Sequence, residues 1–137
     1  MNRRAFLILA AAASATLATD PALAVTAYTP DLLQSELAAG KTVFLDFKAS
    51  WCSTCAAQER VITALKAGNP AYEANIVFIN VDWDAWGEGD LVRQLNIPRR
   101  STLVVLRGDA ELGRIVAGTA KSEIKALMDV ALQEATA

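Results

Sequence analysis

The chain has 137 residues, enough for one domain with a hydrophobic core and too few for two domains of ordinary size. Its formal net charge of −2 provides no basic field for a phosphate backbone, so we expect no nucleic-acid partner. The sequence contains two cysteines and no histidine, which restricts the haem and metal sites that one chain could build.

Residues 1–24 have the three-part pattern of a signal peptide. A basic start precedes a mostly apolar stretch over residues 6–18, and small residues lead up to Ala24. The apolar stretch is shorter than the roughly 20 residues that a membrane-spanning helix needs. We therefore predict a signal peptide over residues 1–24, removed after Ala24, with an uncleaved anchor as the alternative.

The predicted mature domain, residues 25–137, would then work in the periplasm, where disulfides can persist. The run from Arg3 to Leu7 also resembles the twin-arginine export signal. Two arginines are equally typical of an ordinary secretory start, so both export routes stay open.

The first elements of the mature chain are a helix and a buried strand. Residues 29–31 favour a helix start, and Gly40 favours its end. Residues 42–47 are almost all apolar strand formers, which predicts a central strand buried on both faces. Only Asp46 interrupts this apolar run.

Further helices and strands alternate after this strand. A second helix should begin at the cysteines and end at residues 68–70, before a buried strand over residues 76–81. Residues 82–87 read as a loop that leads into a short helix over residues 90–95. Strand, helix and strand in this order predict a parallel crossover.

The last third of the chain predicts a hairpin and a helix. Apolar runs at 102–106 and 112–116 flank a Gly-Asp turn, and the final helix should span residues 122–135 with Ser122 as its cap. An additional strand is possible at residues 25–28. The whole pattern predicts an α/β domain with a central mixed sheet of four to five strands flanked by helices.

The only two cysteines are separated by two residues at the predicted start of the second helix. The positive end of a helix dipole favours a thiolate, so Cys52 should be the attacking thiol. Cys55, one turn into the helix, would then attack the sulfur of Cys52 and resolve a mixed disulfide. A bridge over so short a loop constrains the unfolded chain little, so the pair suits redox chemistry better than structural stapling.

Two thiols in one chain can also serve in haem attachment or in a metal site. Haem attachment would require a histidine after Cys55, where Ala56 stands. A four-ligand zinc site would require soft ligands that this chain lacks, although two copies could share a metal. A metal-binding module and an adaptor with an idle disulfide therefore stay as alternatives, and no metal or other cofactor is expected.

Residues 43–55 resemble the signature of the thioredoxin family, in which a buried strand with an aspartate leads to a tryptophan and two cysteines. Here these residues are Asp46, Trp51, Cys52 and Cys55. Residues 80–82, Thr102 and Gly118 also fall where thioredoxins carry similar residues. The resemblance implies a thioredoxin fold and a protein-disulfide oxidoreductase whose redox-active group is the Cys52–Cys55 pair.

The resemblance also assigns roles to Asp46 and Trp51. Burial should raise the pKa of Asp46, and the matching aspartate of thioredoxins accepts a proton from the second cysteine. Trp51 resembles the family tryptophan that shields the disulfide and contacts partners. The alternatives are an aspartate that faces solvent and a tryptophan that only packs at the strand end.

Several residues depart from the family pattern. Ser53 and Thr54 stand where glycine and proline are usual, and the histidine of strongly oxidising relatives is absent, which favours a reductant or a mild oxidant. Phe78 stands at the position of a family lysine near the aspartate. We expect this replacement to remove a charge from beside Asp46.

The largest departure is Ser101, which aligns with the family's cis-proline. Because a cis bond before a residue other than proline costs about 3–4 kcal/mol, we predict a trans Arg100–Ser101 bond and a reshaped loop. By resemblance, Trp51, Arg100, Ser101 and Thr102 are the candidate substrate-binding residues. If this loop folds near Cys52, Arg99 and Arg100 could stabilise its thiolate or contact an acidic surface of a partner. The alternative is that both are solvated charges on a loop.

The expected activity is reversible disulfide exchange on exported proteins, with substrate reduction favoured and an oxidase or isomerase as the rival. Because no nicotinamide or flavin motif is present, electrons would come from a membrane thiol carrier, by resemblance to exported thioredoxins. We expect the protein to be a monomer.

Overall fold

A computed structural model describes residues 25–137, so the predicted signal peptide lies outside the described residues. The elements in chain order are β1 (Thr26–Ala27), α1 (Pro30–Ala38), β2 (Thr42–Lys48), α2 (Ser53–Gly68), α3 (Ala71–Asn75), β3 (Ile76–Asp82), α4 (Trp83–Trp86), α5 (Asp90–Gln94), β4 (Thr102–Arg107), β5 (Ala110–Val116) and α6 (Lys121–Thr136). No helix in this part of the chain is long and apolar enough to cross a membrane.

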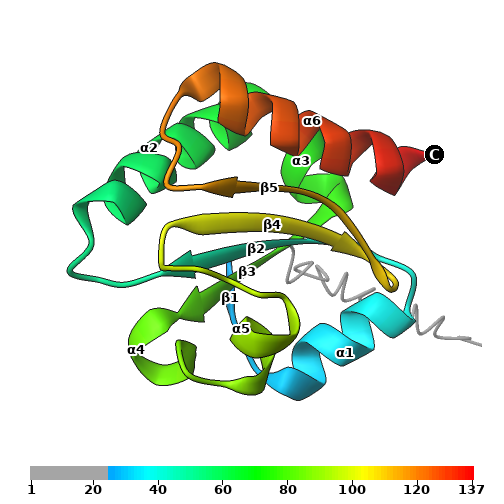
Figure 1. The fold of residues 1–137 in the computed structure, drawn as a ribbon. Coiled ribbons are helices and arrows are strands. Elements are labelled where there is room, and N and C mark those ends of the chain that lie inside the picture. The colour runs from blue at the N-terminus through cyan, green and yellow to red at the C-terminus, as the bar shows by residue number, and fades with distance from the viewer. Residues whose placement is uncertain (1–24) are drawn as a thin grey trace, which may run out of the picture.

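The strands form one five-stranded mixed sheet in the order β1-β3-β2-β4-β5, as Figure 1 shows. The β1–β3 and β2–β3 pairs are parallel, whereas β4 runs antiparallel to both β2 and β5. This arrangement confirms the predicted α/β fold with a central mixed sheet, including the possible strand at the start of the mature chain.

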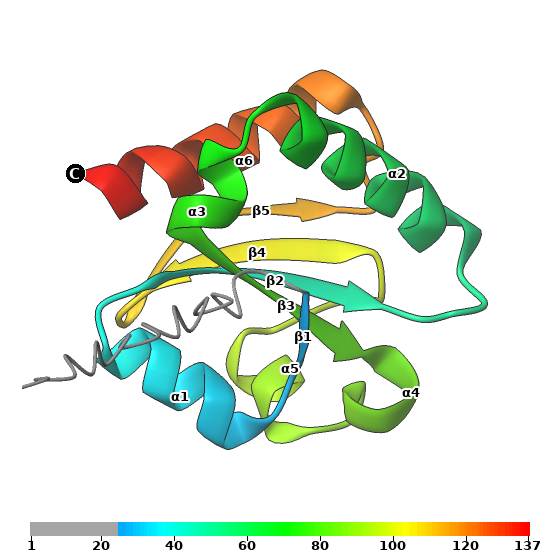
Figure 2. The same ribbon diagram turned by 180° about the vertical axis from the view of Figure 1, so that it is seen from behind.

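Helices cover both faces of the sheet, and Figure 2 shows α2, α3 and α6 on one side with α1, α4 and α5 on the other. Strand β2 is central, and its side chains alternate between two hydrophobic cores. Phe44 packs in the core under α2 and α6, whereas Val43, Leu45 and Phe47 pack in the core under α1 and α5. Asp46 therefore shares its face of the sheet with Phe44 and lies under α2.

Local sequence explains the limits of α1 and α6. The Thr29 hydroxyl accepts a hydrogen bond from Leu32 N at 3.2 Å and caps α1, as its helix-start pattern predicted. The prediction that Ser122 caps the last helix is wrong, because α6 begins at Lys121 and Ser122 already lies in its first turn. Ala120 takes the cap position with no side-chain hydrogen bond.

Two short helices were not predicted. Asn69 Oδ1 accepts a hydrogen bond from Ala71 N and starts α3 directly after α2. Residues 82–87, predicted as a loop, instead contain α4, because the Asp82 carboxylate caps the amide of Asp84. This helix packs Trp83 against the cysteines.

The edge strand β5 is tied to the end of α5 by one arginine. Arg114 Nη2 donates to Leu95 O at 2.7 Å, and Nη1 donates to Asn96 O at 3.2 Å. Arg114 also forms an ion pair with Glu111 on the same strand. The other edge strand, β1, is only two residues long.

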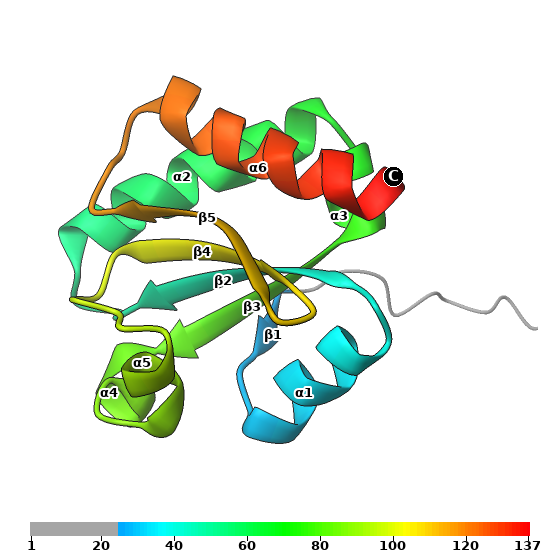
Figure 3. The ribbon, with the colours of Figure 1, turned by 45° about the vertical axis from the view of Figure 1, so that its right-hand side comes forward.

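The end of β2 lies beside the start of β4, as Figure 3 shows. Phe47 is paired with Thr102 in the antiparallel register of these strands. The segment that follows β2 and the segment that precedes β4 are therefore brought together, and both predicted sets of site residues lie there.

Candidate active site

The two cysteines lie at the start of α2 and form a disulfide. Cys52 is the N-cap residue, and its Sγ accepts a hydrogen bond from Cys55 N at 3.1 Å. Helix α2 has 16 residues, so its free amides and dipole favour negative charge on the Cys52 sulfur. Both cysteines are buried, and Cys52, at 5% exposed against 1% for Cys55, is the less buried residue of the pair.

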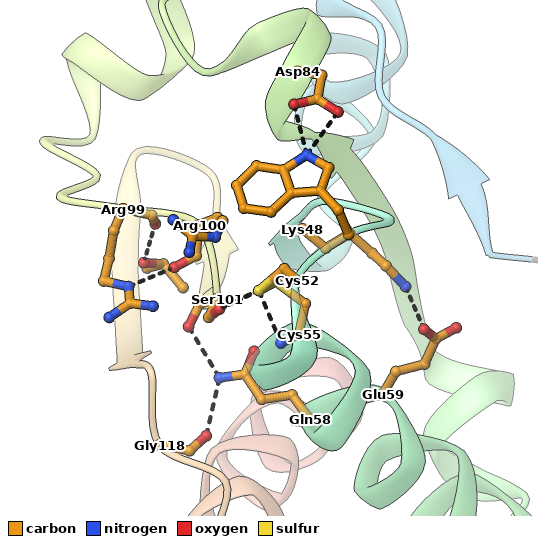
Figure 4. The surroundings of a disulfide bond; sticks show 12 residues. Lys48, Cys52, Cys55, Gln58, Glu59, Asp84, Arg99, Arg100, Ser101 and Gly118 are labelled. Atoms are coloured by element: carbon orange, nitrogen blue, oxygen red, sulfur yellow. Dashed lines mark hydrogen bonds and ion pairs between the residues drawn. A yellow bond between two sulfur atoms is a disulfide. The ribbon is translucent and has the colours of Figure 1, made fainter.

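Ser101 lies directly beside the disulfide. Its Oγ is 3.1 Å from Cys52 Sγ and 3.1 Å from Cys55 Sγ, and Figure 4 shows its side chain turned toward the cysteines. The Arg100–Ser101 peptide bond is trans, as predicted. A serine hydroxyl thus occupies the position beside the sulfurs where thioredoxins place a proline ring.

The backbone of Ser101 is held in the left-handed region, with φ of 64°. This conformation costs a residue with a Cβ about 1–2 kcal/mol. Ser101 N donates to Phe47 O at 2.7 Å, and Ser101 O accepts from Ala117 N at 2.8 Å. These hydrogen bonds fix the loop before β4 and aim the Ser101 side chain at the sulfurs.

Gln58 is a site residue that the sequence interpretation missed. It is fully buried in α2, and its Nε2 donates to Ser101 O and to Gly118 O, both at 2.9 Å. Figure 4 shows this amide between the two carbonyls. A polar residue on the buried face of α2, one turn after Cys55, was the signal that could have revealed it.

Trp51 is 58% exposed and is held on two sides. Its Nε1 donates to both carboxylate oxygens of Asp84 at 3.0 Å, and the Arg100 guanidinium lies 4.4 Å from its ring centroid. Arg99 Nε donates to the backbone oxygen of Arg100. The structure therefore places the Arg100 charge on Trp51, and Asp84 is a second residue that the sequence did not reveal.

The four predicted substrate-binding residues fall into two groups. Trp51 and Arg100 reach the surface, whereas Ser101 and Thr102 are fully buried. Thr102 Oγ1 donates to Arg99 O at 2.6 Å and closes the loop before β4. Thr102 therefore supports the loop from within the fold.

Asp46 lies in the interior, as its position in an apolar strand predicted. It lines a cavity of about 40 Å³ between β2, β3 and α2, together with Lys48, Glu59 and Lys66. Burial raises the pKa of the Asp46 carboxyl to about 7; the charges of Lys48 and Lys66 lower this pKa and that of Glu59 raises it. Within residues 25–137, its Oδ1 has no hydrogen-bond partner.

Phe78 leaves its own position beside Asp46 without a charge, but another element supplies one. Phe78 does stand on β3, but Lys66 of α2 lies over the Phe78 ring, with its Nζ 3.8 Å from the ring centroid. Lys66 also lines the Asp46 cavity and lowers the pKa of Asp46. A lysine from the covering helix thus supplies the charge that the strand lacks.

No group of three or more histidine, cysteine, aspartate or glutamate side chains within residues 25–137 is arranged to hold a metal ion. The chemistry that the described geometry supports is exchange at the Cys52–Cys55 disulfide.

A family model for thioredoxin matches residues 24–130, which is most of the chain. The chain belongs to the thioredoxin family. Thioredoxins need no cofactor, because the redox-active cysteine pair is the catalytic group of these protein-disulfide oxidoreductases. The family and the fold predicted from residues 43–55 are thereby confirmed.

Individual relatives agree with this assignment. Thioredoxin H2-1 of Oryza sativa subsp. japonica is 36% identical over 85 residues, which cover 62% of this chain and 56% of the rice protein. Thioredoxin H5 of the same species is 33% identical over 79 residues, which cover 58% of this chain and 54% of the rice protein. The chain thus spans about half the length of the curated relatives it matches.

Solved structures also match. Trxlp from Edwardsiella tarda EIB202 superposes with a TM-score of 0.66 and 28% identity, over 76% of this chain and 98% of that protein. Thioredoxin of Malassezia sympodialis gives a TM-score of 0.66 at 22% identity, over 81% of this chain and 93% of that protein, which supports the fold.

Proposed function

We propose that this thioredoxin-family protein reduces disulfide bonds of exported proteins by exchange through Cys52 and Cys55. The observation that carries the proposal is the position of Cys52 at the N-cap of α2, with its sulfur accepting the Cys55 amide at 3.1 Å. This geometry favours a thiolate at Cys52 once the disulfide is opened.

The reaction has two exchange steps. The Cys52 thiolate attacks one sulfur of the substrate disulfide, and the other substrate sulfur leaves as a thiolate. Cys55 then loses its proton and attacks Cys52 Sγ, which releases the second substrate sulfur. The substrate gains two electrons, and the protein is left with the Cys52–Cys55 disulfide.

Asp46 is the proposed acceptor of the Cys55 proton. A carboxyl with a pKa of about 7 is present in both protonation states near neutral pH. A group with such a pKa can take up a proton in one step and release it in another. Lys48 and Lys66 beside it stabilise the ionised form that accepts the proton.

Reduction of exported proteins requires a supply of electrons, for which we propose a membrane thiol carrier. The pattern of residues 1–24 supports export, possible by the twin-arginine or the ordinary secretory route. The reduction potential tests the direction of exchange. A potential of about −270 mV, the value of thioredoxin, supports reduction, whereas one of about −120 mV, at the strong-oxidant end of the range, supports an oxidase.

Trapping the partner in cells tests the whole proposal. In a Cys55→Ser variant, mixed disulfides on Cys52 cannot be resolved, so exported substrates and the electron donor should stay attached and can be identified by mass spectrometry. The matched control is the Cys52→Ser, Cys55→Ser variant, which should capture nothing. If both variants capture the same proteins, or if the doubly substituted protein retains full function in cells, the proposal fails.

A further inference from the structure

We propose that the Ser101 hydroxyl is a catalytic residue that donates one hydrogen bond in turn to the Cys52 and the Cys55 thiolates. This inference rests on the disulfide exchange proposed above and adds a third side chain to the reacting sulfurs. Ser101 Oγ lies 3.1 Å from each sulfur, within the distance of a hydrogen bond to sulfur.

The position of the hydroxyl is fixed by the fold. Ser101 is fully buried, and its amide and carbonyl are bound to Phe47 O and Ala117 N. Gln58 Nε2 donates a second hydrogen bond to the same carbonyl. The left-handed φ of 64° is therefore maintained by contacts on three sides, and it directs Oγ toward the sulfurs.

The hydroxyl distinguishes the oxidised form from the reduced form. A disulfide sulfur is a weak acceptor, whereas a thiolate accepts a charge-assisted hydrogen bond that is roughly twice as strong as a neutral one. An O–H group that is equally distant from both sulfurs therefore stabilises the reduced protein more than the oxidised one. Its presence should make the protein less reducing than the same fold without it.

The same O–H can serve both steps of the exchange. In the free reduced protein, it donates to Cys52 Sγ, the attacking thiolate. When Cys52 is bound to the substrate in the mixed disulfide, its sulfur carries no charge, and a rotation of the hydroxyl hydrogen lets Ser101 donate to the Cys55 thiolate instead. No atom is transferred to Ser101, so the electron and proton balance of the two exchange steps is unchanged.

Two substitutions test the proposal. Ser101→Ala removes the hydroxyl and keeps the backbone strain, whereas Ser101→Gly removes the hydroxyl and relieves the strain at positive φ. Both should make Cys52 about tenfold less acidic, measured by ultraviolet thiolate absorbance against pH. Both should also shift the equilibrium with a glutathione buffer about tenfold toward the disulfide, a potential about 30 mV more negative.

Ser50→Ala is the matched control, because Ser50 is an exposed serine two residues before Cys52. It should leave the acidity of Cys52 and the potential at their wild-type values. If Ser101→Ala and Ser101→Gly also keep both values, the inference is overturned. A second measurement needs no substitution: the Ser101 hydroxyl proton should exchange slowly in NMR spectra of the reduced wild-type protein, and rapid exchange counts against the hydrogen bond.

The outcome separates this inference from the proposed function. If the wild-type protein fails to reduce protein disulfides such as those of insulin, the proposed function falls, but the acidity and the potential still report on Ser101. If the wild-type protein is active and the variants show no shift, only the role of Ser101 falls.

Discussion

The Gln58 side chain of α2 lies 2.9 Å from the backbone oxygen of Ser101 and holds the loop that carries the serine against the cysteine-bearing helix. The same amide nitrogen also donates to Gly118 O, at the start of the connection between β5 and α6. One buried amide thus joins three segments around the disulfide.

Replacing Gln58 with leucine should destabilise the protein. The substitution keeps the side-chain volume similar but removes one of the two donors to the buried Ser101 carbonyl and the donor to the part-buried Gly118 carbonyl, so we expect a loss of about 2 kcal/mol in the free energy of unfolding. Urea unfolding of the oxidised protein measures this loss. Gln133→Leu, on an exposed position of α6, is the control and should change the free energy of unfolding by less than about 0.5 kcal/mol.

Asp46 should make the protein less stable as the pH rises. Its folded pKa of about 7 lies above the ordinary value near 3.8, so the folded protein holds a proton that the unfolded chain releases. Stability from this group is therefore fully present below about pH 4 and is lost as the pH rises through about 7. The total effect is on the order of 4 kcal/mol.

Unfolding of the oxidised wild-type and Asp46→Asn proteins between pH 4 and 8 checks this expectation. The asparagine variant should lack the fall in stability and should exceed the wild type most clearly at pH 8. Parallel stability curves for the two proteins would show that the carboxyl does not titrate in this range.

Lys48 and Glu59 form an ion pair, with Lys48 Nζ 2.7 Å from Glu59 Oε2, and should shift the pKa of Asp46 in opposite directions. Lys48→Met removes the charge that most lowers this pKa, so the pKa should rise. Glu59→Gln removes a like charge, so the pKa should fall. Carbon NMR of the Asp46 carboxyl as a function of pH measures both pKa values. If the two substitutions shift the pKa of Asp46 in the same direction, the proposed effects of Lys48 and Glu59 are wrong.

The protein should bind protein disulfides less tightly when either contact that holds the Trp51 ring is removed. Asp84→Ala deletes the acceptor of its indole N–H, and Arg100→Gln deletes the cation over its ring. Each contact is worth about 1 kcal/mol of ordering, so we expect KM to rise about fivefold in each variant while kcat is kept. Arg60→Gln, on an exposed position of α2, should behave as the wild type in the same kinetics.

Patterns along the chain predicted most of the fold, because they report on local structure. The apolar run before the cysteines correctly indicated β2, and Thr29 correctly indicated the start of α1. Helix α4 was missed because its four residues are too few to show a helical period. Its start depends on the Asp82 side chain, which also suits a turn.

The site was predictable where chemistry and sequence spacing coincide, as for Cys52 and Cys55, and for the burial of Asp46. It was not predictable where distant elements meet. Thioredoxins carry a lysine at the position of Phe78 on β3. In this chain Lys66 of α2 supplies the positive charge instead, and no local sequence pattern links the two positions. The Ser101 hydroxyl likewise depends on a positive φ that is set by partners on other segments.

The ties of Arg114 to the end of α5 have a consequence for association between molecules. An open edge strand offers unpaired amides and carbonyls to a second chain and is a common start of aggregation. The edge strand β5 carries the charged side chain of Arg114, which is bound to Leu95 O and Asn96 O, and charged side chains on an edge strand discourage such pairing. The edge strand on the other side of the described sheet, β1, has two residues. Within residues 25–137, both features are of the kind that makes the addition of a further strand to the sheet less favourable.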